Sequence, residues 1–244
     1  DATIATTVDR LHVHASRPKQ YKPRPRHSTH SNMCAGSHTT SRTIAAALER
    51  AVELLRANGV PEPELSAEHL LARAASLDSR AELARARRLS LDDDACAAFD
   101  AMLARRVARE PVQYIVGDWD FHALTLRVEP PVLIPRPETE ELVELVLGSI
   151  GGARAAAPLR ILDVGCGTGC VGLALLNKLP EARCVGLDVS AAAVELSQRN
   201  ARELGLDARY TALHNPAGIG AYGPGGVPRV RLLGGGGGAD DGFD

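Results

Sequence analysis

Three glycines lie between an apolar strand pattern and an apolar helix pattern, in the sequence ILDVGCGTGCVGLALL over residues 161–176. Glycine has no side chain, so it allows a tight turn and lets a ligand lie against bare backbone. The N-terminus of the helix that follows offers N–H groups that have no partner within the helix. We therefore expect a ligand site at this turn. The residues expected to line it are Gly165, Cys166, Gly167, Thr168 and Gly169.

A second strand pattern ends at Asp188. About 20 residues after such a turn, a doubly wound sheet carries the carboxylate that binds ribose hydroxyls, so the cofactor is expected to contain a nucleoside. The same glycines also match the dinucleotide pattern of NAD enzymes when they are aligned as Gly167-x-Gly169-x-x-Gly172. That pattern is weak, and glycine spacing alone does not choose between the two cofactors.

Asp163, at the end of the first strand pattern, favours one cofactor over the other. In a dinucleotide site the turn receives a pyrophosphate, which a carboxylate at this position would repel. S-adenosylmethionine has no phosphate and carries a sulfonium and an ammonium group, which the same carboxylate would attract. The expected cofactor is S-adenosylmethionine, with Asp163 and Asp188 as part of its site.

Strand and helix patterns alternate around this turn. They predict a strand over 159–164, a helix over 170–179, a strand over 183–188 and a helix over 190–204. Such alternation is typical of an α/β fold with a parallel, doubly wound, Rossmann-like sheet.

The chain ahead of the sheet is predicted to be helical over 43–109. Apolar residues at helical spacing stop at Asn58-Gly59, a second segment starts after Pro63, and a third helix is expected over 92–108. These segments are long enough to bury one shared apolar face. Residues 43–109 are therefore predicted to form a small helical bundle.

A β-hairpin linker is expected over 110–136. The stretches Tyr114–Phe121 and Leu124–Val128 show strand patterns with a turn between them. Prolines on both sides of Arg136 hold it in an extended backbone, while Thr139 and the acidic residues after it open a helix.

Composition limits the class of protein. The 244 residues carry a formal charge of −2, so no overall field attracts nucleic acid. No apolar run approaches the roughly 20 residues that a membrane span needs. The five cysteines are odd in number and include no CxxC pair, which favours reduced thiols in an intracellular compartment.

Residues 1–42 are basic, rich in hydroxyl groups and poor in acids, and they are expected to form a disordered tail. This bias is typical of a plastid or mitochondrial transit peptide; untranslated or cloning sequence in frame is the other interpretation, and the protein would then be cytoplasmic. The spacing of His27, His30, Cys34 and His38 could reach one metal ion. Because a structural metal site needs a rigid frame, no metal is expected.

Four stretches closely resemble the HemK-like methyltransferases that modify peptide chain release factors. They are REPVQYIVG at 109–117, Phe121, VLIPRPETE at 132–140 and ILDVGCGTGC at 161–170. The proline segment, VLIPRPETE, is far more specific to this family than the glycine turn is. The resemblance runs from about Thr43 to Leu206, and it implies a helical domain, a hairpin linker and an incomplete class I methyltransferase domain over 137–244.

The resemblance implies transfer of a methyl group from S-adenosylmethionine to the side-chain amide nitrogen of the glutamine in the Gly-Gly-Gln motif of a release factor. The release factor is then the expected partner, and no contact with nucleic acid or membrane is expected. The glycine turn would line the methionine end of the cofactor, and Asp188 would hold its ribose. The positions that match the substrate pocket and its surroundings are Phe121, Arg136, Pro137, Glu138 and Thr139.

Two of these positions have an alternative explanation. Phe121 is equally suited to the core of the hairpin. Glu138 would also offset the dipole at the N-terminus of a helix.

The family's catalytic Asn-Pro-Pro-Tyr motif, at the end of the fourth strand, does not occur in this chain. Asn215-Pro216 follows Asp188 too closely to leave room for a third strand, a helix and a fourth strand, and it continues as Ala217-Gly218. The motif is expected beyond Asp244, so the chain is expected to be C-terminally truncated. The strand over 159–164 would then be an apolar edge.

Two other functions stay open. An adenine N6 methyltransferase shares the fold and a similar motif, but it would call for a basic region with aromatic residues, and the part expected to be ordered has none. The third hypothesis is a catalytically inactive module that binds S-adenosylmethionine or a protein partner.

Overall fold

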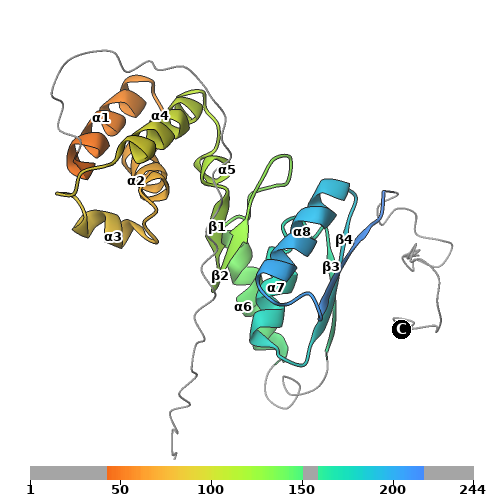
Figure 1. Cartoon of the computed structure of the whole chain (residues 1–244). Helices are drawn as coiled ribbons and strands as arrows, with labels where there is room; N and C mark the ends of the chain where they lie inside the picture. Colours follow the sequence, from red (N-terminus) through yellow and green to blue (C-terminus); the bar gives the residue numbers. More distant parts are fainter. Residues whose placement is uncertain (1–42, 151–158, 217–244) are drawn as a thin grey trace, which may run out of the picture. The chain divides into compact units, whose positions relative to one another are not determined.

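A computed structural model describes residues 43–150 and 159–216 (Figure 1). Its first part is the predicted helical bundle. The helices are α1 (Ile44–Ala57), α2 (Pro63–Ala74), α3 (Arg80–Arg85) and α4 (Asp93–Val107). The end of α1, the start of α2 and both ends of α4 agree with the sequence prediction to within one or two residues. The short helix α3 was not predicted.

Local signals explain where the helices of the bundle begin. The Thr43 hydroxyl accepts a hydrogen bond from Ala46 N at 3.3 Å, and the Asp92 carboxylate accepts one from Ala95 N at 2.7 Å. Each side chain thereby satisfies an N–H group that has no partner within its helix. Fully buried leucines from α1, α2 and α3 then fill a shared core. They include Leu55, Leu70, Leu71 and Leu83.

Arginines near the end of α4 bond within the bundle. Arg109 donates to the carbonyl oxygens of Asn58 and Gly59, at 2.8 Å each, and so caps the end of α1. Arg105 pairs with Glu110. These contacts give both guanidinium groups a structural role at helix ends.

The linker differs in part from the predicted hairpin. Residues Val112–Val116 form a short helix, α5, which ends at Gly117 with a φ of 86°. Only then do strands β1 (Asp118–Phe121) and β2 (Leu124–Arg127) pair antiparallel. The prediction of a strand from Tyr114 onward was therefore wrong for its first residues, because a left-handed glycine ends a helix readily.

The second part of the chain is an α/β layer with the predicted order of elements. Helix α6 (Glu138–Ile150) precedes strand β3 (Arg160–Val164), helix α7 (Cys170–Lys178), strand β4 (Arg183–Asp188), helix α8 (Ala191–Glu203) and strand β5 (Tyr210–His214). The three strands are parallel and lie in the order β3-β4-β5. This is part of a doubly wound, Rossmann-like sheet, preceded by a helical domain and a β-hairpin.

Helices α7 and α8 cover one face of this sheet. The side chain of Tyr210 in β5 lies on that face, next to Gly172 of α7 and Ser197 of α8. Residues of the hairpin and of α6, including Phe121, Leu126 and Val143, share a core with α7. The hairpin therefore packs against the sheet domain.

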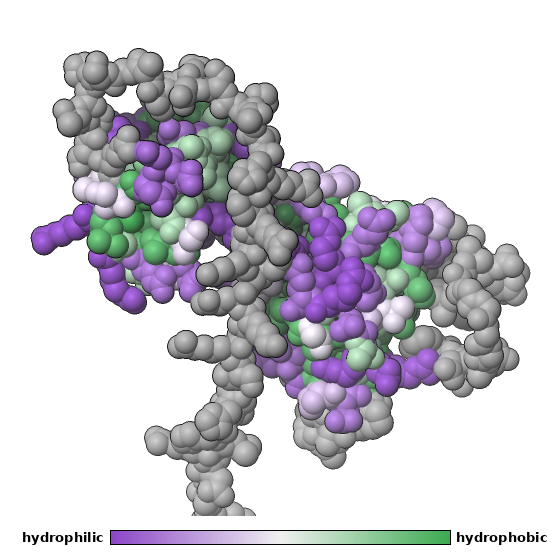
Figure 2. Space-filling model, viewed as in Figure 1, coloured by the Kyte–Doolittle hydropathy of each residue, from purple (hydrophilic) through white to green (hydrophobic). Residues whose placement is uncertain are grey.

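Strand β3 is an edge of the sheet within the described residues. Its side chains alternate, and those that point away from α7 are exposed, with Leu162 at 42% and Val164 at 53%. Figure 2 shows hydrophilic and hydrophobic residues mixed on the visible face of the described parts. The apolar edge expected for residues 159–164 is thus present in the part of the sheet that the structure describes.

Strand β5 was not located from the sequence. It begins at Tyr210 and runs beside β4, so that Asn215 follows a third strand rather than a fourth, with its N–H donating to Asp188 O at 2.8 Å. This position agrees with the exclusion of Asn215-Pro216 as the catalytic motif. The predictions for residues 1–42, including the transit peptide and the His–Cys spacing, lie outside the described residues.

Among the described residues, no helix is both long enough and apolar enough to cross a membrane. The same residues contain no cluster of His, Cys, Asp and Glu that could hold a metal ion.

The close contact between strands and helices can be tested at Gly186 in β4. A Cβ atom added there would lie 2.5 Å from the Tyr210 hydroxyl oxygen and 3.0 Å from Cys166 Cβ. Gly186→Ala should therefore lower the free energy of unfolding by about 1–3 kcal/mol in urea titrations. Gly148→Ala in α6, where nothing lies within 4 Å, is the control and should raise it by about 0.5–1 kcal/mol. Equal urea midpoints for Gly186→Ala and the unsubstituted protein would contradict this packing.

Candidate cofactor site

The glycine turn between β3 and α7 is held by the end of the neighbouring strand. The N–H groups of Gly165 and Cys166 both donate to Leu187 O, at 2.7 and 3.0 Å. Because Leu187 is the last residue but one of β4, these bonds bring the turn next to Asp188. The structure thus joins the glycine turn and the acid that the sequence analysis singled out.

All three glycines have positive φ angles. The absence of a side chain has a different consequence at Gly165 than at Gly169. Gly165, with a φ of 73°, has open space where a Cβ would lie. At Gly169 a Cβ would instead meet Leu173 Cδ1 at 3.0 Å and Ser197 Cβ at 3.1 Å. Gly165 therefore leaves bare backbone for a ligand, whereas Gly169 is required by packing within the protein.

The Asp188 carboxylate is half-buried at the end of β4. One of its oxygens accepts from Gly167 N and the other from Ser190 N, at 2.9 Å each. These bonds fix the orientation of the carboxylate. Each oxygen keeps a second lone pair, so the group can still accept hydrogen bonds from a pair of ribose hydroxyls. The donor set fits a nucleoside.

Asp163 lies at the N-terminus of α7. Its Oδ2 accepts a hydrogen bond from Gly172 N at 3.0 Å. One of the N–H groups that have no partner within the helix is therefore already bonded to a carboxylate. Burial raises the pKa of Asp163, and the nearby Asp188 carboxylate acts in the same direction, while the Gly172 N–H opposes them. A phosphate would meet a carboxylate here instead of free N–H groups. The position suits a cationic ligand better than a pyrophosphate.

Cys166 and Thr168 were expected to line the ligand site, and the structure buries both side chains beneath the turn, at 4% and 2% exposure. Cys166 Sγ lies 3.8 Å from Ser197 Oγ, and burial raises the pKa of its thiol. A contact of these two residues with the cofactor would therefore involve their backbone atoms. That contact stays a prediction.

Tyr210 and Ser197 support the turn from below and were missed in the sequence analysis. Tyr210 is 1% exposed, and burial raises the pKa of its hydroxyl. Its ring fits only because Gly172 and Gly186 lack side chains. A tyrosine at the start of a strand, with glycines in the neighbouring strand and helix, was the available signal.

The proline segment starts beside the turn. Val132 is buried, its Cγ1 lies 4.0 Å from the place of a Gly167 Cβ, and its carbonyl oxygen accepts from the Tyr114 hydroxyl at 2.7 Å. Further along, Thr139 N donates to Arg136 O at 3.0 Å as the chain enters α6. Val132 and Tyr114 therefore anchor this segment against the turn, a contact that the sequence did not reveal.

The five residues predicted near the substrate pocket lie in different environments. Phe121 is 2% exposed and packs in the core with Val143, so the structure supports its alternative role in the core. Arg136, Pro137 and Glu138 are exposed, and Glu138 lies in the first turn of α6, where its charge offsets the helix dipole. A role of these residues and of Thr139 in substrate binding stays a prediction.

Family comparisons identify the two parts of the chain. Residues 46–117 match the PrmC N-terminal domain, and residues 153–217 match the methyltransferase small domain. The helical bundle with α5 thus corresponds to the first domain. The sheet that carries the glycine turn lies within the second match.

Curated proteins with similar sequences are release factor glutamine methyltransferases. The chain is 39% identical to the human MTRF1L release factor glutamine methyltransferase over 69% of this chain and 54% of that protein. It is 42% identical to the release factor glutamine methyltransferase of Moorella thermoacetica, over 70% of this chain and 59% of that protein. The chain is thus similar to release factor glutamine methyltransferases, and it spans between half and two thirds of the length of these relatives.

Solved structures give a slight likeness. A geranyl diphosphate methyltransferase in complex with SAM superposes with a TM-score of 0.27 and 26% identity, over 31% of this chain and 29% of that one. A likeness of this size does not bear on the site.

The raised pKa of Asp163 predicts how stability depends on pH. The folded protein holds the proton of this carboxyl more tightly than the unfolded chain does. The resulting stabilisation is fully present below about pH 4, the ordinary pKa of aspartate, and is lost as the pH rises through the raised pKa of the folded state. Asp163→Asn cannot ionise and should lack this loss.

The free energy of unfolding of Asp163→Asn, relative to the unsubstituted protein, should therefore rise as the pH increases from about 4 through the raised pKa of the folded state. Urea titrations at a series of pH values measure it. Two curves that run parallel across this range would contradict the burial of an ionisable group at residue 163.

Proposed function

We propose that the protein binds S-adenosylmethionine at the glycine turn and transfers its methyl group to the side-chain amide nitrogen of a glutamine in a peptide chain release factor. The main observation in favour of S-adenosylmethionine is that the carboxylate of Asp163 lies at the N-terminus of α7. It disfavours a phosphate at this position and suits a sulfonium and an ammonium group. The names of the relatives support the substrate.

Each element of the site has a separate role in the proposed binding. Asp188 accepts hydrogen bonds from the ribose hydroxyls, with its orientation fixed by Gly167 N and Ser190 N. The open backbone at Gly165 lies against the methionine end of the cofactor. Asp163 contributes negative charge beside the cationic groups. Bound in this way, the cofactor supplies an electrophilic methyl group.

An amide nitrogen is a poor nucleophile, so the rate must come mainly from alignment and from acceptors for its N–H protons. In the reaction a bond forms between the amide nitrogen and the methyl carbon, the bond from that carbon to sulfur breaks, and one N–H proton leaves. The acceptors are expected in an Asn-Pro-Pro-Tyr motif, which residues 1–244 do not contain. The described residues would hold and orient the cofactor.

The proline segment is the proposed approach for the substrate. It is anchored beside the turn at Val132, and the exposed Arg136 follows within a few residues. A release factor is the proposed partner, without contact to nucleic acid or membrane. Action in a plastid or mitochondrion rests on the composition of residues 1–42 alone, with the cytoplasm as the alternative.

The two acids should affect two ligands differently. Asp188→Asn should weaken S-adenosylmethionine and S-adenosylhomocysteine equally, by about tenfold or more, because both carry the same ribose. Asp163→Asn should weaken S-adenosylmethionine several-fold more than S-adenosylhomocysteine, which has no sulfonium; this is a difference of roughly 1 kcal/mol. Isothermal titration calorimetry gives the four dissociation constants. Equal losses for both ligands in Asp163→Asn would contradict the role of its charge.

Methyl transfer tests the substrate. With labelled S-adenosylmethionine and a purified full-length protein that includes the expected Asn-Pro-Pro-Tyr motif, label should enter a release factor and be absent from a variant whose Gly-Gly-Gln glutamine is replaced by glutamate. Duplex DNA and RNA are offered in parallel. Label on adenine would support the N6 methyltransferase alternative, and cofactor binding without any transfer would support the inactive module.

A further inference from the structure

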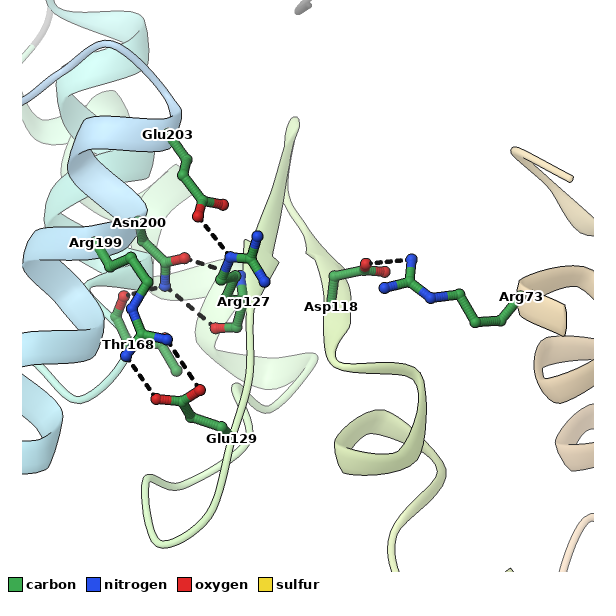
Figure 3. A network of polar contacts seen from close by, with 8 residues as sticks. All are labelled: Arg73, Asp118, Arg127, Glu129, Thr168, Arg199, Asn200 and Glu203. Carbon is green, nitrogen blue, oxygen red and sulfur yellow. Dashed lines mark hydrogen bonds and ion pairs between the residues drawn. The ribbon is translucent and has the colours of Figure 1, made fainter. Parts of the chain in front are cut away.

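Asn200 in α8 is a buried amide that bonds to two separate segments. It is 1% exposed. Its Nδ2 donates to Thr168 O in the glycine turn at 2.9 Å and to Arg127 O in β2 at 3.2 Å, and its Oδ1 accepts from Arg127 N at 2.8 Å (Figure 3). One side chain thus spans the turn and the hairpin.

The bonding pattern requires an asparagine. Two carbonyl oxygens need donors and one N–H needs an acceptor, which only a side-chain amide supplies in this space. An aspartate has the same shape, but it would place a carboxylate against two carbonyl oxygens. Alanine would remove all three hydrogen bonds, one of them buried and two partly buried, which is costly.

Two ion pairs hold the hairpin and the residues after it to the same helix. Arg127 pairs with Glu203 at 2.6 Å, and Arg199 pairs with Glu129 through two contacts of 3.0 and 2.7 Å (Figure 3). These pairs are partly exposed, so their contribution to stability is modest. The buried Asn200 is the contact that also reaches the turn.

The hairpin leads to the proline segment, which is proposed to receive the substrate, at one end and to the helical bundle at the other. Residues 129–132 connect β2 to the start of the proline segment, where Val132 packs against α8. On β1, Asp118 pairs with Arg73 of α2 at 2.7 Å, and Trp119 lies beside His69, with ring centres 4.8 Å apart. A change at the turn can therefore reach the start of the proline segment through β2.

We infer that Asn200 is a positioning residue that joins the glycine turn to the hairpin, so that binding of the cofactor at the turn also orders the hairpin and the start of the substrate segment. The inference rests on the proposed cofactor site. Its physical basis is that Thr168 O and both backbone groups of Arg127 share one rigid side chain. Ordering of the turn then restricts β2 as well.

Gln198, two residues earlier on the same helix, offers a matched control. Its amide also bonds to backbone groups, with Oε1 accepting from Ala212 N at 3.0 Å and Nε2 donating to Tyr210 O at 3.5 Å. Both partners belong to β5, not to the hairpin. Gln198→Glu thus makes the same chemical change as Asn200→Asp and affects a different neighbour.

The test is amide hydrogen exchange by mass spectrometry on the purified protein, with and without S-adenosylmethionine. In the unsubstituted protein the cofactor should slow exchange in the turn and also in residues 124–129. In Asn200→Asp the cofactor should slow exchange in the turn alone, and S-adenosylmethionine should bind to this variant several-fold more weakly. Gln198→Glu should keep the response of the hairpin. A hairpin response that persists in Asn200→Asp would overturn the inference.

If the cofactor does not bind to the unsubstituted protein, the proposed function fails. The joint between the turn and the hairpin is then tested by comparing exchange in the unsubstituted protein and in Asn200→Asp, both without cofactor. Asn200→Asp should then exchange about tenfold faster in both the turn and residues 124–129, because both lose a bond to one side chain. The helical bundle should be unchanged. Faster exchange in only one segment, or equally throughout the chain, would contradict a joint between the two.

Discussion

The candidate cofactor site depends on one carbonyl group. Leu187 O accepts hydrogen bonds from two successive N–H groups of the glycine turn, at Gly165 and Cys166. A turn without side chains cannot be held by packing of its own, so backbone bonds must fix it. Because the acceptor belongs to β4, the position of the turn follows from the register of β3 with β4, which pairs Val164 with Leu187. The parallel sheet is thus what places the turn beside Asp188.

The two acids of the site form hydrogen bonds within the protein in addition to any contact with a ligand. Asp163 bonds to the N-terminus of α7, and Asp188 bonds to the turn and to Ser190, the N-cap residue of α8. Each carboxylate therefore fixes the direction of a neighbouring element. The same placement sets the charge of the site, because two carboxylates near one turn disfavour a phosphate and favour a cation. Structure and ligand preference come from the same groups.

Sequence patterns predicted the elements that have strong local signals. The start of α4 at Asp92, the glycine turn and the acid at Asp188 were all predicted, because capping residues and glycine spacing act over a few positions. The short α3 and α5 and the strand β5 were missed or assigned wrongly, since elements of five or six residues leave little periodicity. Phe121 could not be assigned to core or pocket, because only packing with Val143 and α7 decides its burial.

Contacts between distant segments needed the structure. Asn200 is 73 residues from Arg127 and 32 from Thr168, so no local pattern links them. Its position on the apolar side of α8, next to the buried Ala201 and one turn after the buried Leu196, was the available sign that a polar side chain had partners in the interior. A buried amide with three bonds is costly to disrupt at any one of them, because the remaining groups stay out of water. The turn, the hairpin and α8 therefore hold one another in place, which is why the part of the site proposed to bind the cofactor and the part proposed to receive the substrate share one support.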